Sequence, residues 1–160
     1  MSYNEKLIVF DLDYTLWPLH VDECATPFST NQQNRAVMDN FGRVCYLYSD
    51  TLKILSFLKK KNYTIAIASR AENICGSYQL LQLFGIADYF RYKEIYPGSK
   101  VQHFTVLRAK SNVDYKDIIF FDNDGRNIRD VQKLGVNCVL LTEEISFKFI
   151  LSILNPKKKK

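Results

Sequence analysis

Carboxylates stand directly after two short apolar runs in this 160-residue sequence. Asp11 and Asp13 follow the run at residues 7–10, and Asp122 follows the run at residues 118–121. An unbroken apolar run of this length is typical of a strand that is covered on both faces of a parallel sheet. Open α/β sheets bind their ligands outside the carboxyl ends of the strands. We therefore expect these acidic side chains to lie together at one edge of a sheet.

Carboxylates that are gathered in one crevice repel each other unless a cation lies among them. Hard oxygen ligands, few protein carboxylates and a substrate phosphate to complete the coordination favour Mg²⁺ over zinc or calcium. The sequence therefore predicts a magnesium site that also receives a phosphoryl group.

Asp11 and Asp13 are two positions apart, so on an extended segment both carboxylates point the same way and can address one phosphorus atom. Beside the metal, Asp11 stays ionised and can attack phosphorus to form an aspartyl-phosphate. Asp13 can protonate the leaving oxygen and later deprotonate the attacking water. The alternative is a pair of solvated turn residues that cap a helix, and the other motifs in register favour catalysis over it.

Ser69 and Lys100 are the candidates for holding the phosphate, because phosphoryl transfer depends mainly on positioning and charge stabilisation. Ser69 directly follows the predicted strand at residues 64–68, where its hydroxyl and the next amides can bind an anion at a helix N-terminus. Lys100 follows the turn at residues 97–99 and can reach both the phosphate and Asp11. A helix N-cap is the alternative for Ser69, and an ordinary surface lysine is the alternative for Lys100.

Hydrophobic periodicity predicts an alternating βα chain and hence an α/β fold. Beyond the two runs above, strands are expected at residues 64–68, 89–96 and 136–141, and helices at 51–61, 71–84, 101–110, 128–134 and 147–154. Ser49 or Asp50 is the expected N-cap of the first helix. Residues 19–40 have little periodicity and are expected to form an irregular loop or flap, with a short strand near residues 44–48.

Composition predicts one domain, at residues 1–155, followed by a disordered lysine-rich tail at residues 156–160. The lysines of the tail supply four of the five net positive charges, so nucleic-acid and membrane partners are not expected. No secretory signal is recognised at the N-terminus, which predicts a cytoplasmic location. The four cysteines are widely spread, have no metal-ligand spacing and are expected to be free thiols.

The ordered set of motifs resembles a known family. Asp11-Leu12-Asp13-Tyr14-Thr15, Ser69, Lys100 and Phe121-Asp122 are similar to the four signature motifs of haloacid dehalogenase (HAD) phosphatases. The resemblance is closer to the acid phosphatase-like, magnesium-dependent phosphatase branch, which lacks a cap, through the segments Asp11-Leu12-Asp13-Tyr14-Thr15-Leu16-Trp17-Pro18, Ala68-Ser69-Arg70, Ile95-Tyr96-Pro97-Gly98-Ser99-Lys100-Val101 with His103-Phe104, and Arg126-Asn127-Ile128 with Asp130-Val131.

The resemblance implies a three-layer, doubly wound parallel sheet of the HAD type with a small flap and no large cap domain. It also implies that Asp11 is the nucleophile, that Asp13 is the acid/base, and that Asp122 and the main-chain carbonyl of Asp13 join Asp11 on the metal. Asn123 stands where the family often has a second acid, and its amide can supply either an oxygen ligand or a hydrogen-bond donor to the groups that hold the metal.

The expected partner is a phosphorylated substrate, either a small molecule or a group attached to protein, and the resemblance implies phosphotyrosine or fructosamine-6-phosphate. Arg70, Tyr14 and Trp17 are candidates for shaping the substrate pocket, with a packed aromatic or a surface ion pair as the alternative. The chain is expected to be a monomer or a weak dimer. Two other functions stay open: a phosphate-binding regulatory or phospho-acceptor module with little turnover, and a phosphomutase or phosphonate hydrolase on the same scaffold.

Overall fold

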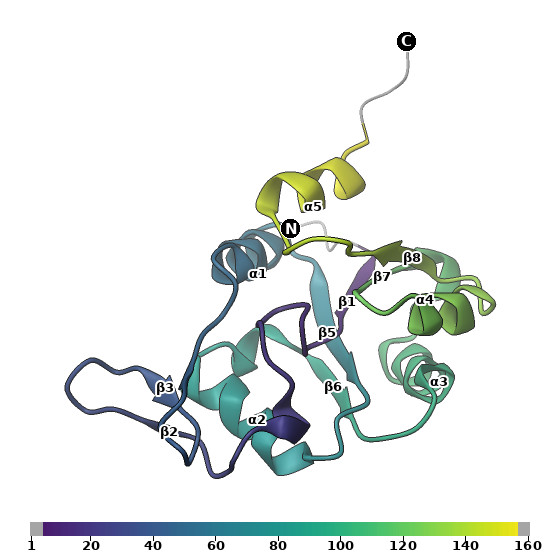
Figure 1. Cartoon of the computed structure of the whole chain (residues 1–160). Helices are drawn as coiled ribbons and strands as arrows, with labels where there is room; N and C mark the ends of the chain where they lie inside the picture. The colour runs from purple at the N-terminus through teal and green to yellow at the C-terminus, as the bar shows by residue number, and fades with distance from the viewer. Residues whose placement is uncertain (1–4, 157–160) are drawn as a thin grey trace.

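A computed structural model describes residues 5–156 of the chain and has a parallel sheet at its centre. The sheet contains five strands in the order β6-β5-β1-β7-β8 (Figure 1). Its strands are β1 (Leu7–Phe10), β5 (Thr64–Ser69), β6 (Tyr92–Ile95), β7 (Ile118–Asp122) and β8 (Asn137–Leu140). Each neighbouring pair is parallel, as the apolar runs predict. Of the predicted tail, residues 157–160 lie outside the described part of the chain.

Strand order places the expected catalytic residues at the centre of the sheet. The chain builds β5 and β6 on one side of β1, then returns to build β7 and β8 on the other side. The crevice of a doubly wound sheet opens where the strand order reverses in this way, which here is between β1 and β7. Asp11 follows β1, and Asp122 ends β7. The amide of Asp11 donates to the carbonyl of Phe121 at 3.1 Å, so the two strand ends are in register.

Helices cover both faces of the sheet and give the three layers that the family resemblance implies (Figure 1). Alternate residues of β1 point to opposite faces: Ile8 and Phe10 into one core, Leu7 and Val9 into the other. The helices of the first face are α1 (Thr51–Lys60), α2 (Ile74–Leu83) and α5 (Phe147–Leu154), and those of the second are α3 (Lys100–Ser111) and α4 (Gly125–Gln132). Three short 3₁₀ helices are Val21–Glu23, Ala87–Tyr89 and Tyr115–Asp117.

The segment between β1 and α1 is more regular than its sequence indicates. It forms a small antiparallel sheet from β2 (Ser29–Thr30), β3 (Val37–Met38) and β4 (Val44–Cys45), which we call the flap (Figure 1). The expectation of an irregular loop was therefore wrong in part, and the strand expected near residues 44–48 is shorter and belongs to the flap. Two-residue strands carry no detectable alternation, so their pairing depends on contacts that periodicity does not report. The described residues contain no large cap domain.

One helix starts later than predicted, and another has its predicted start but lacks the expected side-chain cap. Helix α2 begins at Ile74 rather than near Ala71, because the Asn73 side chain caps it by accepting from the amide of Gly76 at 2.9 Å. Asp50 is at the N-cap position of α1 but makes no side-chain cap hydrogen bond. Instead it accepts from the amide of Phe147 at 2.9 Å and fixes the start of α5. Within residues 5–156, no helix is long and apolar enough to cross a membrane.

Candidate active site

Lys100 joins the ends of the two central strands. Its Nζ donates to Asp11 Oδ1 at 2.8 Å and to Asp122 Oδ2 at 2.7 Å. The lysine is the first residue of α3, whose N-cap Ser99 accepts from the amide of Val101 at 3.2 Å. The Lys100 side chain is only 1% exposed, so the surface-lysine alternative was wrong. This arrangement places one buried cation between two buried carboxylates.

The charges of this cluster shift each other's protonation. Burial raises the pKa of Asp11 from its usual 3.8 to about 7, although the charge of Lys100 opposes the rise. Burial alone would lower the pKa of Lys100, but the charges of Asp11 and Asp122 outweigh it and raise that pKa above its usual value. Lys100 therefore stays cationic, while Asp11 needs further positive charge to remain ionised at neutral pH.

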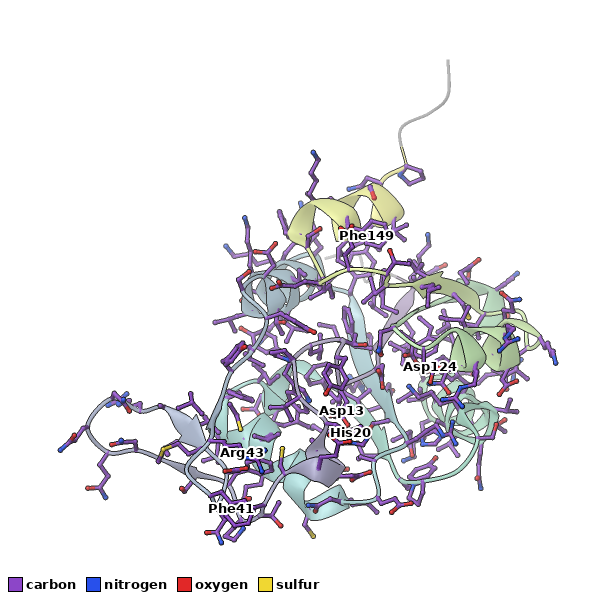
Figure 2. The ribbon with its side chains drawn as sticks, in the orientation of Figure 1. Asp13, His20, Phe41, Arg43, Asp124 and Phe149 are labelled. Carbon is purple, nitrogen blue, oxygen red and sulfur yellow. The ribbon has the colours of Figure 1, made fainter. Side chains whose placement is uncertain are left out.

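Asp13 is held by three groups on the segment that follows it. Its Oδ1 accepts from Trp17 Nε1 at 2.8 Å, and its Oδ2 accepts from the amide of Val21 at 3.3 Å. Oδ2 also lies 3.6 Å from His20 Nδ1, and Figure 2 shows Asp13 and His20 side by side near the middle of the molecule. Burial raises the pKa of Asp13 in spite of the Trp17 hydrogen bond. A carboxyl with a raised pKa is suited to donate a proton.

Trp17 does not line the pocket, so the expectation that it helps to shape the substrate site was wrong. Its ring is fully buried and packs at 5.8 Å, centroid to centroid, from Phe84. The indole nitrogen donates to Asp13, while the aromatic rings pack in the core. A single indole donor in a sequence gives no sign of its partner, which is why Trp17 could be placed near the site but its contact could not be predicted.

Tyr14 lies on the outer edge of the site and has a left-handed backbone with φ of 56°. A non-glycine residue in this conformation costs of order 1–3 kcal/mol and is found most often where surrounding structure enforces it. The enforcing contact is a hydrogen bond from the Tyr14 amide to the carbonyl of Trp17 at 2.8 Å. The side chain is 45% exposed and faces solvent beside the two aspartates.

Ser69 ends β5 and is buried at the same edge of the sheet. Its Oγ accepts from the amide of Ala71 at 3.2 Å, which shapes the turn after the strand. Arg70 is exposed and donates from Nη1 to Asn127 Oδ1 at 3.4 Å. Asn127 in turn donates from Nδ2 to Asp122 Oδ2 at 2.9 Å. Asn127 thus orients a strand-end carboxylate, a role that its place in α4 did not indicate.

Asn123 marks the point where the oxygens of the predicted metal site converge. With its amide in the orientation that satisfies its hydrogen bonds, the nitrogen donates to Asp11 Oδ2 at 3.1 Å and Asp122 Oδ1 at 3.2 Å. It also donates to the main-chain carbonyl of Asp13 at 3.3 Å. Three hard oxygens therefore surround the amide nitrogen of Asn123. Oxygens of this kind are the ligands that Mg²⁺ prefers. In the described part of the chain, no three His, Cys, Asp or Glu side chains form a cluster that could hold a metal ion.

These residues line an open polar pocket with a volume of about 440 Å³. Asp124, which caps α4 by accepting from the amide of Arg126 at 2.9 Å, also lines the pocket. Figure 2 shows it beside α4. The pocket brings together every predicted site residue except Trp17, and the full lining is Asp11, Asp13, Tyr14, His20, Asp22, Ser69, Arg70, Ala71, Glu72, Lys100, Asp122, Asn123, Asp124, Arg126 and Asn127.

The fold is shared with solved structures of low sequence identity. A hydrolase from Streptococcus pneumoniae TIGR4 superposes with a TM-score of 0.68 at 13% identity, covering 97% of this chain and 100% of that one. L-2-haloacid dehalogenase from Xanthobacter autotrophicus, with chloropropionic acid covalently bound, has a TM-score of 0.62 at 10% identity and coverages of 97% and 84%. The architecture is therefore that of the HAD class.

Sequence comparison narrows the class to a family. The family model described as Acid Phosphatase matches residues 4–154. Magnesium-dependent phosphatase 1 of Homo sapiens is 45% identical over 139 residues, which is 87% of this chain and 79% of that protein. A HAD-like hydrolase superfamily protein of Schizosaccharomyces pombe is 37% identical over 142 residues, or 82% of each chain. The chain belongs to the acid phosphatase family of the HAD superfamily and is a phosphoric monoester hydrolase.

Proposed function

We propose that this protein is a magnesium-dependent phosphatase that hydrolyses phosphate monoesters through an aspartyl-phosphate on Asp11. The observation that carries the proposal is the placement of Asp11 itself. One of its oxygens is paired with buried Lys100, and the other is among the oxygens that converge beside Asn123. A carboxylate that is fixed at both ends and opens on a polar pocket is suited to attack phosphorus.

The reaction proceeds in two displacements. A carboxylate oxygen of Asp11 bonds to phosphorus while the ester oxygen leaves and takes a proton from the carboxyl of Asp13. Water then attacks the phosphorus of the aspartyl-phosphate and gives its proton to Asp13, which releases inorganic phosphate and restores Asp11. The raised pKa of Asp13 supports its role as the proton donor of the first step.

Ser69, Arg70 and Lys100 hold the transferring phosphoryl group. Lys100 supplies a fixed positive charge, and Ser69 offers its hydroxyl, whose oxygen is oriented by the amide of Ala71. Arg70 is at the rim, where it can pair with a phosphate oxygen or with a second anion on the substrate.

Asp11, Asp122 and the main-chain carbonyl of Asp13 would hold Mg²⁺, and the Asn123 side chain would join them by presenting its amide oxygen in place of its nitrogen. When bound, this ion supplies positive charge that keeps Asp11 ionised and stabilises charge on the phosphoryl oxygens. The magnesium assignment draws support from the oxygen-only donor set and from the name of the human relative.

We assign the phosphatase domain to residues 1–155 and expect a cytoplasmic monomer or weak dimer. Its partner is a phosphorylated substrate rather than a nucleic acid or a membrane. Phosphotyrosine and protein-linked sugar phosphates such as fructosamine-6-phosphate are the proposed substrates, because the pocket is open enough to admit a phosphate on a bulky carrier.

A phospho-acceptor or regulatory module with little turnover is the second candidate. Such a module needs an acceptor carboxylate and a lysine, both of which are present. It does not need a second carboxyl beside the acceptor, and the ordered, half-buried Asp13 therefore favours turnover.

Phosphate release from Asp11→Asn and Asp13→Asn tests the proposal. Asp11→Asn preserves size and should abolish turnover in a folded protein, whereas Asp13→Asn should lose about 10²–10⁴-fold, the usual contribution of a general acid/base. Mass spectrometry of wild type trapped with beryllium fluoride or acid quench should locate the adduct on Asp11. Near wild-type turnover by Asp11→Asn, free of contaminating phosphatase, would exclude covalent catalysis through this residue.

Metal titration tests the cofactor. Chelator should silence the wild type, and Mg²⁺ should restore it. Asp122→Ala should weaken Mg²⁺ binding more than Asn123→Ala, because a buried carboxylate adds charge to the site and an amide does not. Full activity in excess chelator, or recovery with zinc alone, would contradict the assignment.

A further inference from the structure

His103 is a fully buried histidine that takes no part in the proposed chemistry. It is on the first turn of α3, three residues after Lys100. Its Nε2 lies 2.8 Å from the carbonyl oxygen of Ser69 and 2.7 Å from that of Tyr96. Its Nδ1 lies 3.1 Å from the carbonyl oxygen of Ser99. One ring therefore contacts the end of β5, the exit of β6 and the N-cap of α3.

The partners of Nε2 identify it as a donor. Carbonyl oxygens only accept hydrogen bonds, so the two shorter contacts assign the hydrogen to Nε2, which shares it between Ser69 and Tyr96. In this tautomer the Nδ1 contact with the Ser99 carbonyl is not a hydrogen bond. The amide of Tyr96 also donates to the Ser69 carbonyl, at 3.1 Å. The Ser69 carbonyl therefore accepts two hydrogen bonds, one from His103 and one from Tyr96. These bonds fix the orientation of the turn that faces the phosphate.

The ring of His103 is itself held in place. Tyr96 stacks on it with 4.2 Å between ring centroids and 15° between planes. Burial, together with the nearby Glu94 carboxylate, raises the pKa of Tyr96 to about 12, so its hydroxyl keeps its proton. Glu94 is buried and paired with Lys110 at 2.7 Å. The imidazole is therefore supported by a chain of contacts across β6 and α3.

We propose that His103 is a positioning residue: by fixing Ser69 and Lys100 relative to each other, it determines how tightly the site binds the phosphoryl group. The inference rests on the proposed function, because Ser69 and Lys100 are the groups that hold the phosphoryl oxygens there. His103 links them directly: it bonds the carbonyl of one and is on the same helical turn as the other. A displacement of about 1 Å in such groups costs about 10²-fold in rate.

Two amide substitutions separate the bonds of the ring. Gln can place its Nε2 near the position of the imidazole Nε2, whereas the shorter Asn reaches only the position of Nδ1. His103→Gln should therefore retain the bonds to Ser69 and Tyr96, and His103→Asn should lose them. Thr105→Val is the matched control, because Thr105 is on the same helix and its hydroxyl bonds only the exposed carbonyl of Val101.

The readouts are kcat, KM and the inhibition constant of inorganic phosphate, measured with Mg²⁺ on variants whose circular dichroism and thermal unfolding show a folded protein. His103→Asn should weaken phosphate binding and lower kcat/KM by about 10²-fold, and His103→Gln should recover most of both. Thr105→Val should match wild type. Equal inhibition constants of phosphate for wild type and the three variants would show that His103 serves only in core packing, and would overturn the proposal.

A measurement on the wild type covers the case in which His103→Asn does not fold. The sequence has two histidines, so ¹⁵N-histidine labelling gives two sets of ring signals. The buried Nε2 proton of His103 should exchange slowly and shift as inorganic phosphate saturates the site. No shift at saturating phosphate would overturn the positioning role. If the wild type released phosphate from none of the substrates, the proposed function itself would instead be contradicted.

Discussion

Lys100 is the residue on which the charge balance of the site depends. It is buried between Asp11 and Asp122, and its two short contacts offset part of the cost of removing these groups from water. Burial of an ion pair adds little net stability, but the loss of one partner leaves charge uncompensated. The same cation can therefore matter for folding as well as for phosphate binding.

Lys100→Met should destabilise the metal-free protein by about 3–5 kcal/mol, the usual cost of a buried charge that loses its partner. Added Mg²⁺ should recover part of the loss, since a cation that binds only the folded state stabilises it. Urea unfolding with and without Mg²⁺ measures both effects. Lys116→Met, at an exposed position, is the control, and equal unfolding midpoints for the two variants would contradict the buried-charge argument.

Asp11 should make the metal-free protein less stable as pH rises toward neutrality. Its pKa is raised from 3.8 to about 7 on folding, so the folded state binds more protons than the unfolded state between these values. Stability from this group is fully present below pH 3.8 and is lost as pH rises through about 7. Asp11→Asn removes the titration, so the difference in melting temperature from wild type should move in favour of the variant between pH 5 and 8. A difference that stays constant would count against the raised pKa.

The site residues that sequence could identify share one property: each follows an apolar strand or a glycine turn. Asp11, Ser69 and Asp122 are strand-end residues, and Lys100 follows Gly98. The contacts of His103 and Asn127 could not be predicted, because a helical side chain gives no indication of which distant main-chain or carboxylate group it meets. Both lie inside the motifs that carry the family resemblance, and their burial distinguishes them from surface residues.

At the scale of elements, the buried strands and α5 could be predicted closely, whereas the paired strands of the flap could not. Strand β1 is buried at every position, so its unbroken apolar run reported its environment directly. The flap strands are two residues each, and their register is set by turns and side-chain bonds that periodicity does not record. Asp39 is the main such residue: its Oδ1 accepts from the amides of Phe41 and Arg43, both at 2.9 Å.

Asp39→Ala should loosen the flap without unfolding the domain. Each lost hydrogen bond contributes about 1 kcal/mol, so amides of β3 and β4 should exchange with solvent roughly 10- to 30-fold faster. Hydrogen–deuterium exchange measures this by peptide, and the core strands should keep their protection. Asn40→Ala is the control at an exposed neighbouring position. Uniform loss of protection across β1 and β7 would show that Asp39 supports the whole domain instead.

At the scale of the whole molecule, short segments that are hydrogen-bonded to each other form the pocket edge, and no added domain contributes to it in the described residues. Asp22, in the 3₁₀ helix after Asp11 and Asp13, accepts from the amides of Glu72 at 3.1 Å and Asn73 at 2.8 Å. This links the β1 side of the pocket to the start of α2. In Figure 2, Phe41 and Arg43 of the flap lie apart from Asp13 and His20. The described residues leave the pocket mouth open to solvent.

An open mouth should favour phosphate esters on bulky carriers, and Tyr14 is the surface that such carriers meet first. Its half-exposed ring beside Asp13 can stack on a phosphotyrosine ring or pack against the chain that carries a sugar phosphate. Phosphotyrosine peptides and protein-linked fructosamine-6-phosphate should therefore have higher kcat/KM than free sugar phosphates. Tyr14→Ala should lower kcat/KM for the bulky substrates by about tenfold, the usual worth of an aromatic contact, and leave small esters nearly unchanged.

Tyr46→Ala is the matched control for this substitution, because Tyr46 is 60% exposed and does not line the catalytic pocket. Steady-state rates on phosphotyrosine peptides, protein-linked fructosamine-6-phosphate and free sugar phosphates, with Mg²⁺ and in chelator, separate substrate choice from catalysis. Strong turnover of free sugar phosphates with none of phosphotyrosine peptides or protein-linked sugars would refute the open-pocket argument, while the roles of Asp11 and Asp13 would stand. Equal losses from Tyr14→Ala on large and small esters would show instead that Tyr14 acts on the aspartates, through the left-handed turn that it shares with them.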